Sequence, residues 1–425
     1  MSSRFPQFRQ LAAVVITAGL LTMHASAQQP ARITLDDAIK LALTNSPSIK
    51  ALRTTIDQSK AQEITAHLRP NPDLSWDTQF IPIFSPNLFS VDTLNTLQQF
   101  DMGVGYLFER GQKRQRRFDA AKDLTAVTEA QVHDGERALT FNVAQQFVNV
   151  LLAKSNLQFT TTDLESYKRT VQINEDRYKA GDLSKSDFLK IKVQLLQFQT
   201  DVNAARLAQV QALASLRQLI GYDQLPAGYD VIGDLAYEPV HGGLDDMEAL
   251  AIRERPDYRA AQLGINSAQS QLNLAKANGK QDLNASFLYS HVSDASSGSF
   301  FFSIPLPIFN RNQGEIARTR FALDQAQFTS TAARDIVYTD VRNAYEGLKS
   351  NEEIVTLYQG GYLQQAEESR DISEFAYKQG AAALLDYLDA ERSYRATELA
   401  YRQTLAAYMV SLEQLKQATG TRTLP

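Results

Sequence analysis

The stretch from Phe100 to Phe108, which reads FDMGVGYLF, decides the fold class of this chain. Apolar side chains occupy every second position, and small or polar residues lie between most of them. This period of two is typical of a β-strand with two different faces. The run is also close to the roughly 9–11 residues that a tilted strand needs to cross a bilayer. The stretch therefore predicts a strand that either faces lipid or belongs to a small soluble sheet.

Three further runs alternate in the same way, so that the sequence predicts two hairpins. The four predicted strands lie at about 73–82, 99–109, 282–291 and 298–309. A small soluble sheet packed on helices would fit each strand alone, whereas four strands in matched hairpins favour the membrane. Four strands leave two open edges, and each unpaired edge group in hydrocarbon costs several kcal/mol. A barrel would therefore need several copies, two for eight strands or three for twelve, and the periodicity does not choose between them.

The chain consists of two similar halves. Leu35-Asp36-Asp37 recurs as Leu244-Asp245-Asp246, and Tyr178-Lys179-x-Gly181 recurs as Tyr377-Lys378-x-Gly380. These matches predict a first repeat over 28–221 and a second over 244–425. Glycine and proline are frequent between them, which is typical of a linker over 222–243.

Each half reads as a helix, two strands and then very long helices. From Gln112 to Tyr178 there is no proline and one glycine. This stretch predicts a helix of about 65 residues, on the order of 100 Å long. From Gln313 to Tyr377 the interruptions are Gly314, Gly347 and the pair Gly360-Gly361. The predicted fold is mainly α with a transmembrane β-barrel portion, built from a duplicated helix–hairpin–long-helix unit.

A heptad rhythm of apolar side chains runs through the last predicted helix, from Leu384 to Leu415. Glu391 and Glu398 lie inside this stripe. Two acids in such a stripe argue against a dry seam, so the sequence predicts a polar-lined or water-facing wall.

Composition excludes several functions. The 43 basic and 48 acidic side chains give a net charge of −5, which argues against a nucleic-acid partner. The chain has no cysteine. It can therefore form no disulfide, iron–sulfur cluster or cysteine-bound zinc site, and we do not expect a lipoprotein. The five histidines are scattered, and no H-E-x-x-H, G-x-S-x-G or phosphate-binding loop is present. We expect no enzyme activity, no cofactor and no metal site.

The N-terminus has the features of a secretory signal peptide. Arg4 and Arg9 precede an apolar run from Leu11 to Leu21, and Ala25-Ser26-Ala27 follows as a small-x-small cleavage pattern. We expect residues 1–27 to be removed. In a Gram-negative bacterium the mature protein would then lie in the periplasm or the outer membrane.

Taken together, the sequence resembles the TolC-like outer-membrane factors, also called outer-membrane efflux proteins. The leucine–acidic openings, the two hairpins and the paired Tyr-Lys-x-Gly tips carry this resemblance. Residues 70–74, 111–114 and 306–314 are also similar to the CzcC-like heavy-metal branch. The resemblance implies a homotrimer, with a twelve-stranded barrel in the outer membrane on an α-helical barrel in the periplasm.

The resemblance also implies a function. The chain would be the passive exit duct of a tripartite efflux system, with metal cations as cargo, and its partners would be a periplasmic adaptor and an inner-membrane RND pump. Two alternatives stay open. One is the outer-membrane duct of a drug-efflux or type I protein-secretion system, and the other is a periplasmic coiled-coil adaptor without a pore.

Several site residues follow from the resemblance. Asp386 and Asp389 match acids at the periplasmic constriction, where rings of carboxylates would favour cations. Tyr377 and Asp187 match positions of a tip latch, in turns marked by Gly181 and Gly380, and Ala382 stands where some relatives have a link-forming arginine. The alternative is that these acids are ordinary solvated residues at helix N-termini.

A basic cluster lies where the second strand is predicted to turn into a helix. Its members are Arg110, Lys113, Arg114, Arg116 and Arg117. Positive charge at a helix N-terminus opposes the helix dipole, so something should compensate it. One hypothesis is contact with anionic lipid headgroups at the inner face of the outer membrane, and the alternative is a solvated face or salt bridges within the tunnel wall.

Overall fold

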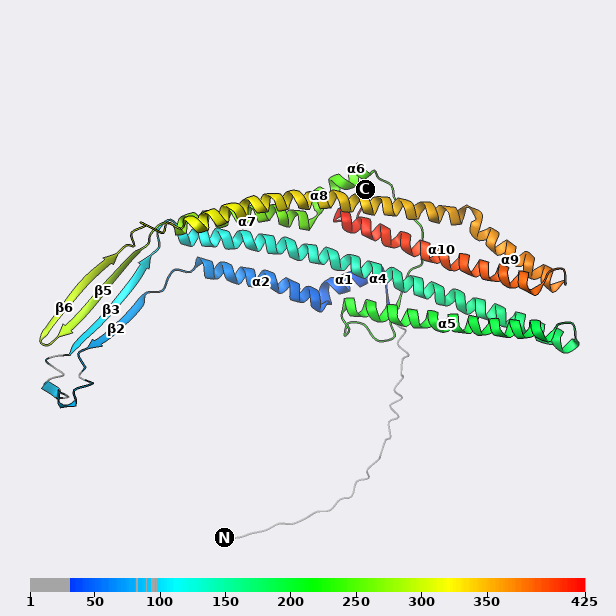
Figure 1. The fold of residues 1–425 in the computed structure, drawn as a ribbon, viewed down its shortest axis with the longest axis horizontal. Helices are drawn as coiled ribbons and strands as arrows, with labels where there is room; N and C mark the ends of the chain where they lie inside the picture. The colour runs from blue at the N-terminus through cyan, green and yellow to red at the C-terminus, as the bar shows by residue number, and fades with distance from the viewer. Residues whose placement is uncertain (1–30, 82, 89, 93–95, 97, 425) are drawn as a thin grey trace, which may run out of the picture.

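The computed structural model describes residues 31–424 except 82, 89, 93–95 and 97. The predicted signal peptide, residues 1–27, lies outside the described residues. The molecule is elongated, with a sheet at one end and two helical hairpin tips at the other (Figure 1). Among the described helices, none combines the length and the hydrophobicity that crossing a membrane requires.

The sheet is antiparallel and has the strand order β2-β3-β5-β6. Its strands are β2 (Asp73–Gln79), β3 (Gln99–Phe108), β5 (Leu283–Val292) and β6 (Ala295–Ser303). The central pair β3–β5 joins the two halves of the chain, while β2 and β6 are the edges. Both edges have a strand partner on one side only within the described chain.

The predicted alternation produces two unlike faces. In the register of the sheet, Trp76 lies opposite Met102, and Met102 lies opposite Tyr289. Phe287 lies opposite Phe300, and all five of these large side chains are exposed. Most side chains on the other face are small or polar, although Leu288 and Phe301 also lie there, and Asp101 accepts a hydrogen bond from the Ser290 hydroxyl at 2.5 Å. The sheet therefore presents one apolar face to its surroundings.

The fourth strand differs from its predicted range. The sequence predicted a strand over 298–309, but β6 begins at Ala295 and ends at Ser303. It ends before Pro305 and Pro307, which have no backbone N–H to donate to a ladder. It begins early because a turn at Ser293, with φ of 52°, pairs Ala295 with Val292.

Nine α-helices of the described chain form the rest of the molecule. In the first half they are α1 (Leu35–Asn45), α2 (Pro47–His67), α4 (Lys113–Ala180) and α5 (Lys185–Ile220). In the second half they are α6 (Leu244–Glu254), α7 (Pro256–Asn278), α8 (Gln313–Leu357), α9 (Leu363–Lys378) and α10 (Leu384–Thr419). Shorter elements are β1 (Arg32–Ile33), which pairs with β4 (Asp230–Val231), the 3₁₀ turn η1 (Pro86–Leu88) and the π-helical turn η2 (Tyr358–Tyr362).

The two halves have corresponding layouts. In the first, α4 runs from the sheet to the tip, with α2 beside its sheet end and α5 beside its tip end (Figure 1). In the second, α7 and α10 flank α8 and α9 in the same manner. Helix α4 has 68 residues, so it is about 100 Å long at ~1.5 Å per residue. It also packs against α7 and α10, and thereby joins the halves.

The second half has a break that the first lacks. Between α8 and α9 the helix passes through η2, where Gly361 has φ of 121°. Glycine adopts this backbone region without the steric cost that a Cβ would add. The sequence marked Gly360-Gly361 as an interruption of the long helix, and the chain bends there (Figure 1).

Three apolar clusters stabilise the helical part. One is built on α1, α4 and α5 around Val143 and Leu216, and the second on α6, α8 and α10 around Val341 and Leu415. The third lies toward the tips and combines α4 and α5 with Tyr377 and the first turns of α10. It is this third cluster that joins the two hairpins.

Candidate functional site at the hairpin tips

The repeated tip motif builds the same aromatic pair twice. Tyr178 stacks on Phe188 with ring centroids 5.0 Å apart, and Tyr377 stacks on Tyr387 at 5.5 Å. In each hairpin the first ring precedes the turn and the second lies in the returning helix. Both turns use a glycine with positive φ, Gly181 at 89° and Gly380 at 72°. The tips are thus two versions of one local structure.

Tyr377 ties the two hairpins together. Its hydroxyl donates a hydrogen bond to Asn174 Oδ1 at 2.7 Å, and both residues are buried. This bond joins α9 to α4, whereas the repeat counterpart Tyr178 is exposed. Burial raises the pKa of Tyr377, so the phenol stays protonated and remains a donor.

Asp187 does not contact Tyr377 by any hydrogen bond or ion pair in the described part of the chain. Its carboxylate accepts from the Ser184 hydroxyl at 2.9 Å and pairs with Lys190 at 3.0 Å. These hydrogen bonds lower the pKa of Asp187, which acts at the third position of α5 as a helix-capping acid. The partner of Tyr377 is instead Asn174. No motif surrounds Asn174, so no sequence pattern pointed to it.

Asp386 and Asp389 lie on the exposed side of the first turns of α10. The Asp386 carboxylate accepts from the Ala383 backbone N–H at 3.2 Å, and Asp389 forms an ion pair with Arg392. Leu384 and Tyr387 form the buried side of the same turns. The two acids therefore point away from the hairpin core. They can line a shared passage only if several chains surround it.

A buried charge cluster lies one to two turns farther along α10. The Arg395 guanidinium donates to Asp163 Oδ2 at 2.5 Å and to Asp201 Oδ2 at 2.6 Å. It also lies over the Phe198 ring, 3.9 Å from the centroid. Glu391 is buried beside it, so at this position the stripe is lined by polar groups of the protein. The heptad pattern places the acid in the stripe but does not show which helix covers it.

Most positive charges of the basic cluster are paired with acidic side chains of the same chain. Lys113 pairs with Asp282 at 2.7 Å, Arg117 forms an ion pair with Glu109, and Arg116 lies 3.7 Å from Asp119. The first two contacts connect the start of α4 to the ends of β5 and β3, and the third lies within α4. In the described part of the chain, the guanidinium groups of Arg110 and Arg114 form no such pair.

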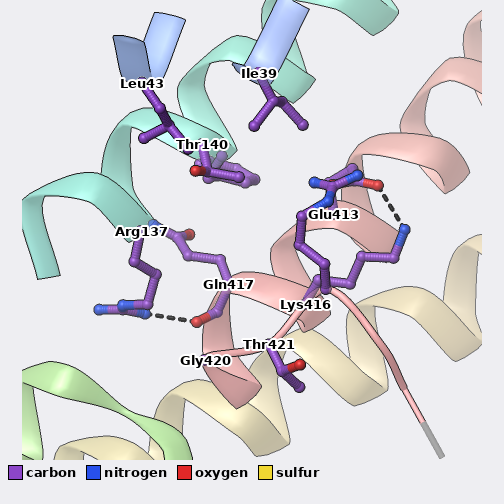
Figure 2. Close-up of a pocket in the computed structure, with 11 residues that line it drawn as sticks. Ile39, Leu43, Arg137, Thr140, Glu413, Lys416, Gln417, Gly420 and Thr421 are labelled. Carbon is purple, nitrogen blue, oxygen red and sulfur yellow. Dashed lines mark hydrogen bonds and ion pairs between the residues drawn. The ribbon is translucent and has the colours of Figure 1, made fainter. Parts of the chain in front are cut away.

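A small pocket of about 160 Å³ lies between α1, α4 and the end of α10, and Figure 2 shows the residues that line it. Its cationic groups already have hydrogen-bond or ion-pair partners within the chain. Arg137 donates to the Gln417 carbonyl at 2.6 Å, and Lys416 pairs with Glu413 at 2.7 Å. The pocket is therefore part of the joint between the two halves. Among the described residues, no three His, Asp or Glu side chains are grouped so as to hold a metal ion.

The hydrogen bond of Tyr377 yields a prediction. Tyr377→Phe will leave the buried Asn174 carbonyl without this donor, at a cost of about 1–3 kcal/mol. We expect faster proteolysis at the tips and a lower unfolding midpoint of the full chain. Tyr178→Phe, the repeat counterpart, should change neither, because Tyr178 is exposed. Equal sensitivity of the two variants would contradict the assignment.

Comparisons with known proteins agree with this geometry. A model of the family described as outer membrane efflux protein matches residues 38–222 and 249–421, which are the two halves. The cobalt-zinc-cadmium resistance protein CzcC of Cupriavidus metallidurans is 22% identical over 363 residues, covering 85% of this chain and 84% of that protein. The cation efflux system protein CusC of Escherichia coli K12 is 25% identical over 377 residues, covering 84% of this chain and 80% of that one.

A solved structure of CusC has the same architecture. It covers 98% of this chain and 99% of its own, with a TM-score of 0.76 at 19% identity. The likeness extends over the sheet, the long helices and both tips. The predicted fold class, mainly helical with four strands per chain, is confirmed.

Proposed function

The chain belongs to the outer membrane efflux protein family, and from this premise we propose that it forms the passive exit duct of a tripartite pump for metal cations. It is an efflux channel component of the outer membrane and not an enzyme. One observation supports the duct most directly: a sheet with an exposed apolar face stands at one end of a rod of helices, the longest of which, α4, is about 100 Å long. Residues 1–27 would direct export, and the barrel alone would attach the protein to the membrane.

The open edges of the sheet support assembly into a trimer. In hydrocarbon, unpaired backbone groups are costly, so the outer edge of β2 must meet a partner strand. The free edge of β6 in a second copy supplies one, and three copies would give a closed barrel of twelve strands. The same arrangement would bring the helical parts together as a tunnel, with a periplasmic adaptor and an inner-membrane pump as partners.

The names of two relatives favour metal cations as the cargo class. CzcC is named for cobalt, zinc and cadmium resistance, and CusC for cation efflux. In a trimer, Asp386 and Asp389 would each become a ring of three carboxylates, which attracts cations and repels anions. These acids would conduct the cargo at a constriction without binding it tightly.

Engineered cysteines test the duct, because the chain has none of its own. Asp389→Cys should form disulfides between subunits under oxidising conditions when the tips are closed, and the linked chains should migrate as oligomers. Lys190→Cys changes the repeat counterpart on α5 and should assemble in the same way without forming disulfides between subunits. An intact trimer in which Asp389→Cys fails to crosslink would contradict the constriction.

Deletion of the gene tests the cargo. We expect the deletion strain to become sensitive to divalent cations such as zinc, cobalt or cadmium, with complementation by the wild-type gene. A panel of drugs and a search for retained secreted proteins form the comparison. Sensitivity to drugs alone, or loss of a secreted protein alone, would reject metal cargo while leaving the duct in place.

The two arginines of the basic cluster that pair with no acid among the described residues, Arg110 and Arg114, support a contact with lipid. Arg110 is exposed and Arg114 half-buried at the junction of the sheet with α4, beside the exposed Phe108. Replacing both with glutamine should slow insertion into vesicles that contain anionic lipid more than into zwitterionic ones. Arg318→Gln, which changes an exposed arginine paired with Glu315, serves as the control. Equal rates in the two kinds of vesicle would reject the contact.

A further inference from the structure

The buried cluster near the tips contains more carboxyl groups than its central cation can neutralise. Arg395 on α10 already pairs with Asp163 on α4 and with Asp201 on α5. Glu391 lies one helical turn before Arg395 and is only 7% exposed. It is therefore a third carboxyl group around one guanidinium. An uncompensated charge in such a place is costly, and a carboxyl group avoids the cost by keeping its proton.

Groups from every neighbouring helix face Glu391. They are Asp163, Tyr167 and, at the exposed rim, Arg169 on α4, Asp201 on α5 beyond Arg395, Arg370 and Glu374 on α9, and Tyr387, Tyr394 and Arg395 on α10. Arg370 is the second cation that acts on Glu391, but it pairs with Asp371 at 2.6 Å and lies 4.0 Å from the centroid of the Tyr394 ring. It is thus engaged on the outer side of the cluster.

The balance of these groups decides the protonation of Glu391. Burial, followed by the Asp163 charge, raises the pKa of Glu391 to about 7, although Arg370 and Arg395 act in the opposite direction. Asp163 stays the ionised member of the pair because Arg395 donates directly to it. Glu391 and Asp163 line the same cleft, so a protonated Glu391 can donate a hydrogen bond to the Asp163 carboxylate. Burial also raises the pKa of Tyr167 and Tyr387, which stay neutral.

Water can reach this pair. A cleft of about 260 Å³ between α4, α9 and α10 is lined by Asp163, Glu391 and Arg370. Tyr387, at its wall, belongs to the apolar cluster that holds the hairpins together. A proton can therefore exchange without unfolding of the helices, and its loss would place a second negative charge inside the joint.

We propose that Glu391 and Asp163 form a proton-binding site that fastens the α9–α10 hairpin to the α4–α5 hairpin while they share one proton and loosens this joint when the proton leaves. The inference rests on the proposed duct only in that separated hairpins would widen its periplasmic end. In separated hairpins Glu391 would be solvated and bind its proton more weakly. The joined state is therefore favoured at low pH, and that preference is lost as the pH rises from about 5 to about 7, by up to about tenfold per pH unit.

Hydrogen exchange of the full chain in detergent tests the site. We expect the amides of residues 384–395, after correction for the intrinsic pH dependence, to lose protection by at least about tenfold between pH 5.5 and pH 8.0. Glu391→Gln, which mimics the protonated group, should remain protected at both values. Unchanged wild-type protection, or a pH dependence that survives in Glu391→Gln, would overturn the proposal.

Two further variants keep the test decisive. Asp163→Asn removes the charge that faces Glu391 and should move the midpoint of the transition to lower pH, whereas an unmoved midpoint would count against the pair. Glu413→Gln changes another buried carboxyl group of α10, one that pairs with Lys416 and Arg422, and should leave the transition as in wild type. Conductance in planar bilayers tests the duct separately. A chain that forms no channel would contradict the proposed function, and the hydrogen-exchange result would still decide whether the proton site exists.

Discussion

Replacement of Arg395 with methionine will lower the free energy of unfolding by about 3–5 kcal/mol at neutral pH. Methionine keeps much of the volume over Phe198 but removes the guanidinium. Asp163, whose side chain is 8% exposed, then stays buried beside Glu391 without a cation. Breaking a buried pair from one side costs more than the pair contributes, because the remaining charge is uncompensated. The shift in unfolding of the purified full chain, followed by circular dichroism of its helices, measures this loss.

Matched variants separate charge from packing. Arg253→Met removes an arginine that is 72% exposed and paired with the adjacent Glu254, so the expected change is within about 0.5 kcal/mol. The double variant Asp163→Asn with Arg395→Met should recover part of the loss, since both buried charges disappear together. A similar loss for Arg253→Met and Arg395→Met, or a double variant less stable than Arg395→Met alone, would refute the buried pair as the cause.

Gly103→Val will prevent most of the chain from reaching its membrane-inserted form. A Cβ at Gly103 would lie 2.7 Å from Ser75 Oγ, 3.0 Å from Leu288 Cδ1 and 3.2 Å from the Phe287 carbonyl oxygen. The side chain would thus meet both neighbouring strands, and the backbone oxygen cannot rotate away. Overpacking of this kind costs about 1–3 kcal/mol or more, and three copies of the chain would each incur it.

Gly105→Val is the matched control, two positions along the same face of β3. The nearest atom to a Cβ there is Ser286 Cβ at 3.7 Å, an ordinary contact. The yield of folded oligomer in the outer-membrane fraction, judged by resistance to SDS without heating, should fall sharply for Gly103→Val and stay near wild type for Gly105→Val. The reverse order would show that the register of the sheet is wrong.

Elements with strong local signals could be predicted from the sequence. Helix α4 lacks proline throughout its 68 residues, and β3 alternates except at Leu107, so both have nearly the predicted bounds. Strand β6 was harder. Its first half reads Ala295-Ser296-Ser297-Gly298-Ser299, which has no apolar alternation, and it is extended because it pairs with β5. Tertiary pairing overrode local preference there.

The positions of site residues could be predicted from the sequence only where a single helix sets them. Asp386 and Asp389 lie in the first turns of α10, as their positions in the repeated motif suggested. The partners of Tyr377 and Arg395 could not be found in this way. Asn174 and Asp163 lie on α4, more than 200 positions away along the chain, and only the packing of the hairpins brings them close. For the same reason the heptad pattern left open whether Glu391 faces water or other polar groups, and the structure shows it buried.

The β3–β5 ladder has a consequence for the order of assembly. It pairs strands from different halves, and Asp101 meets Ser290 across 189 positions of sequence. During synthesis and export, β3 would therefore emerge long before its partner. Contacts at such separation form slowly, whereas the helices between them form from local interactions. We expect the rod of helices to fold first and to hold the ends of β3 and β5 together. The apolar face would then be completed late, when other copies are already at hand to cover its edges.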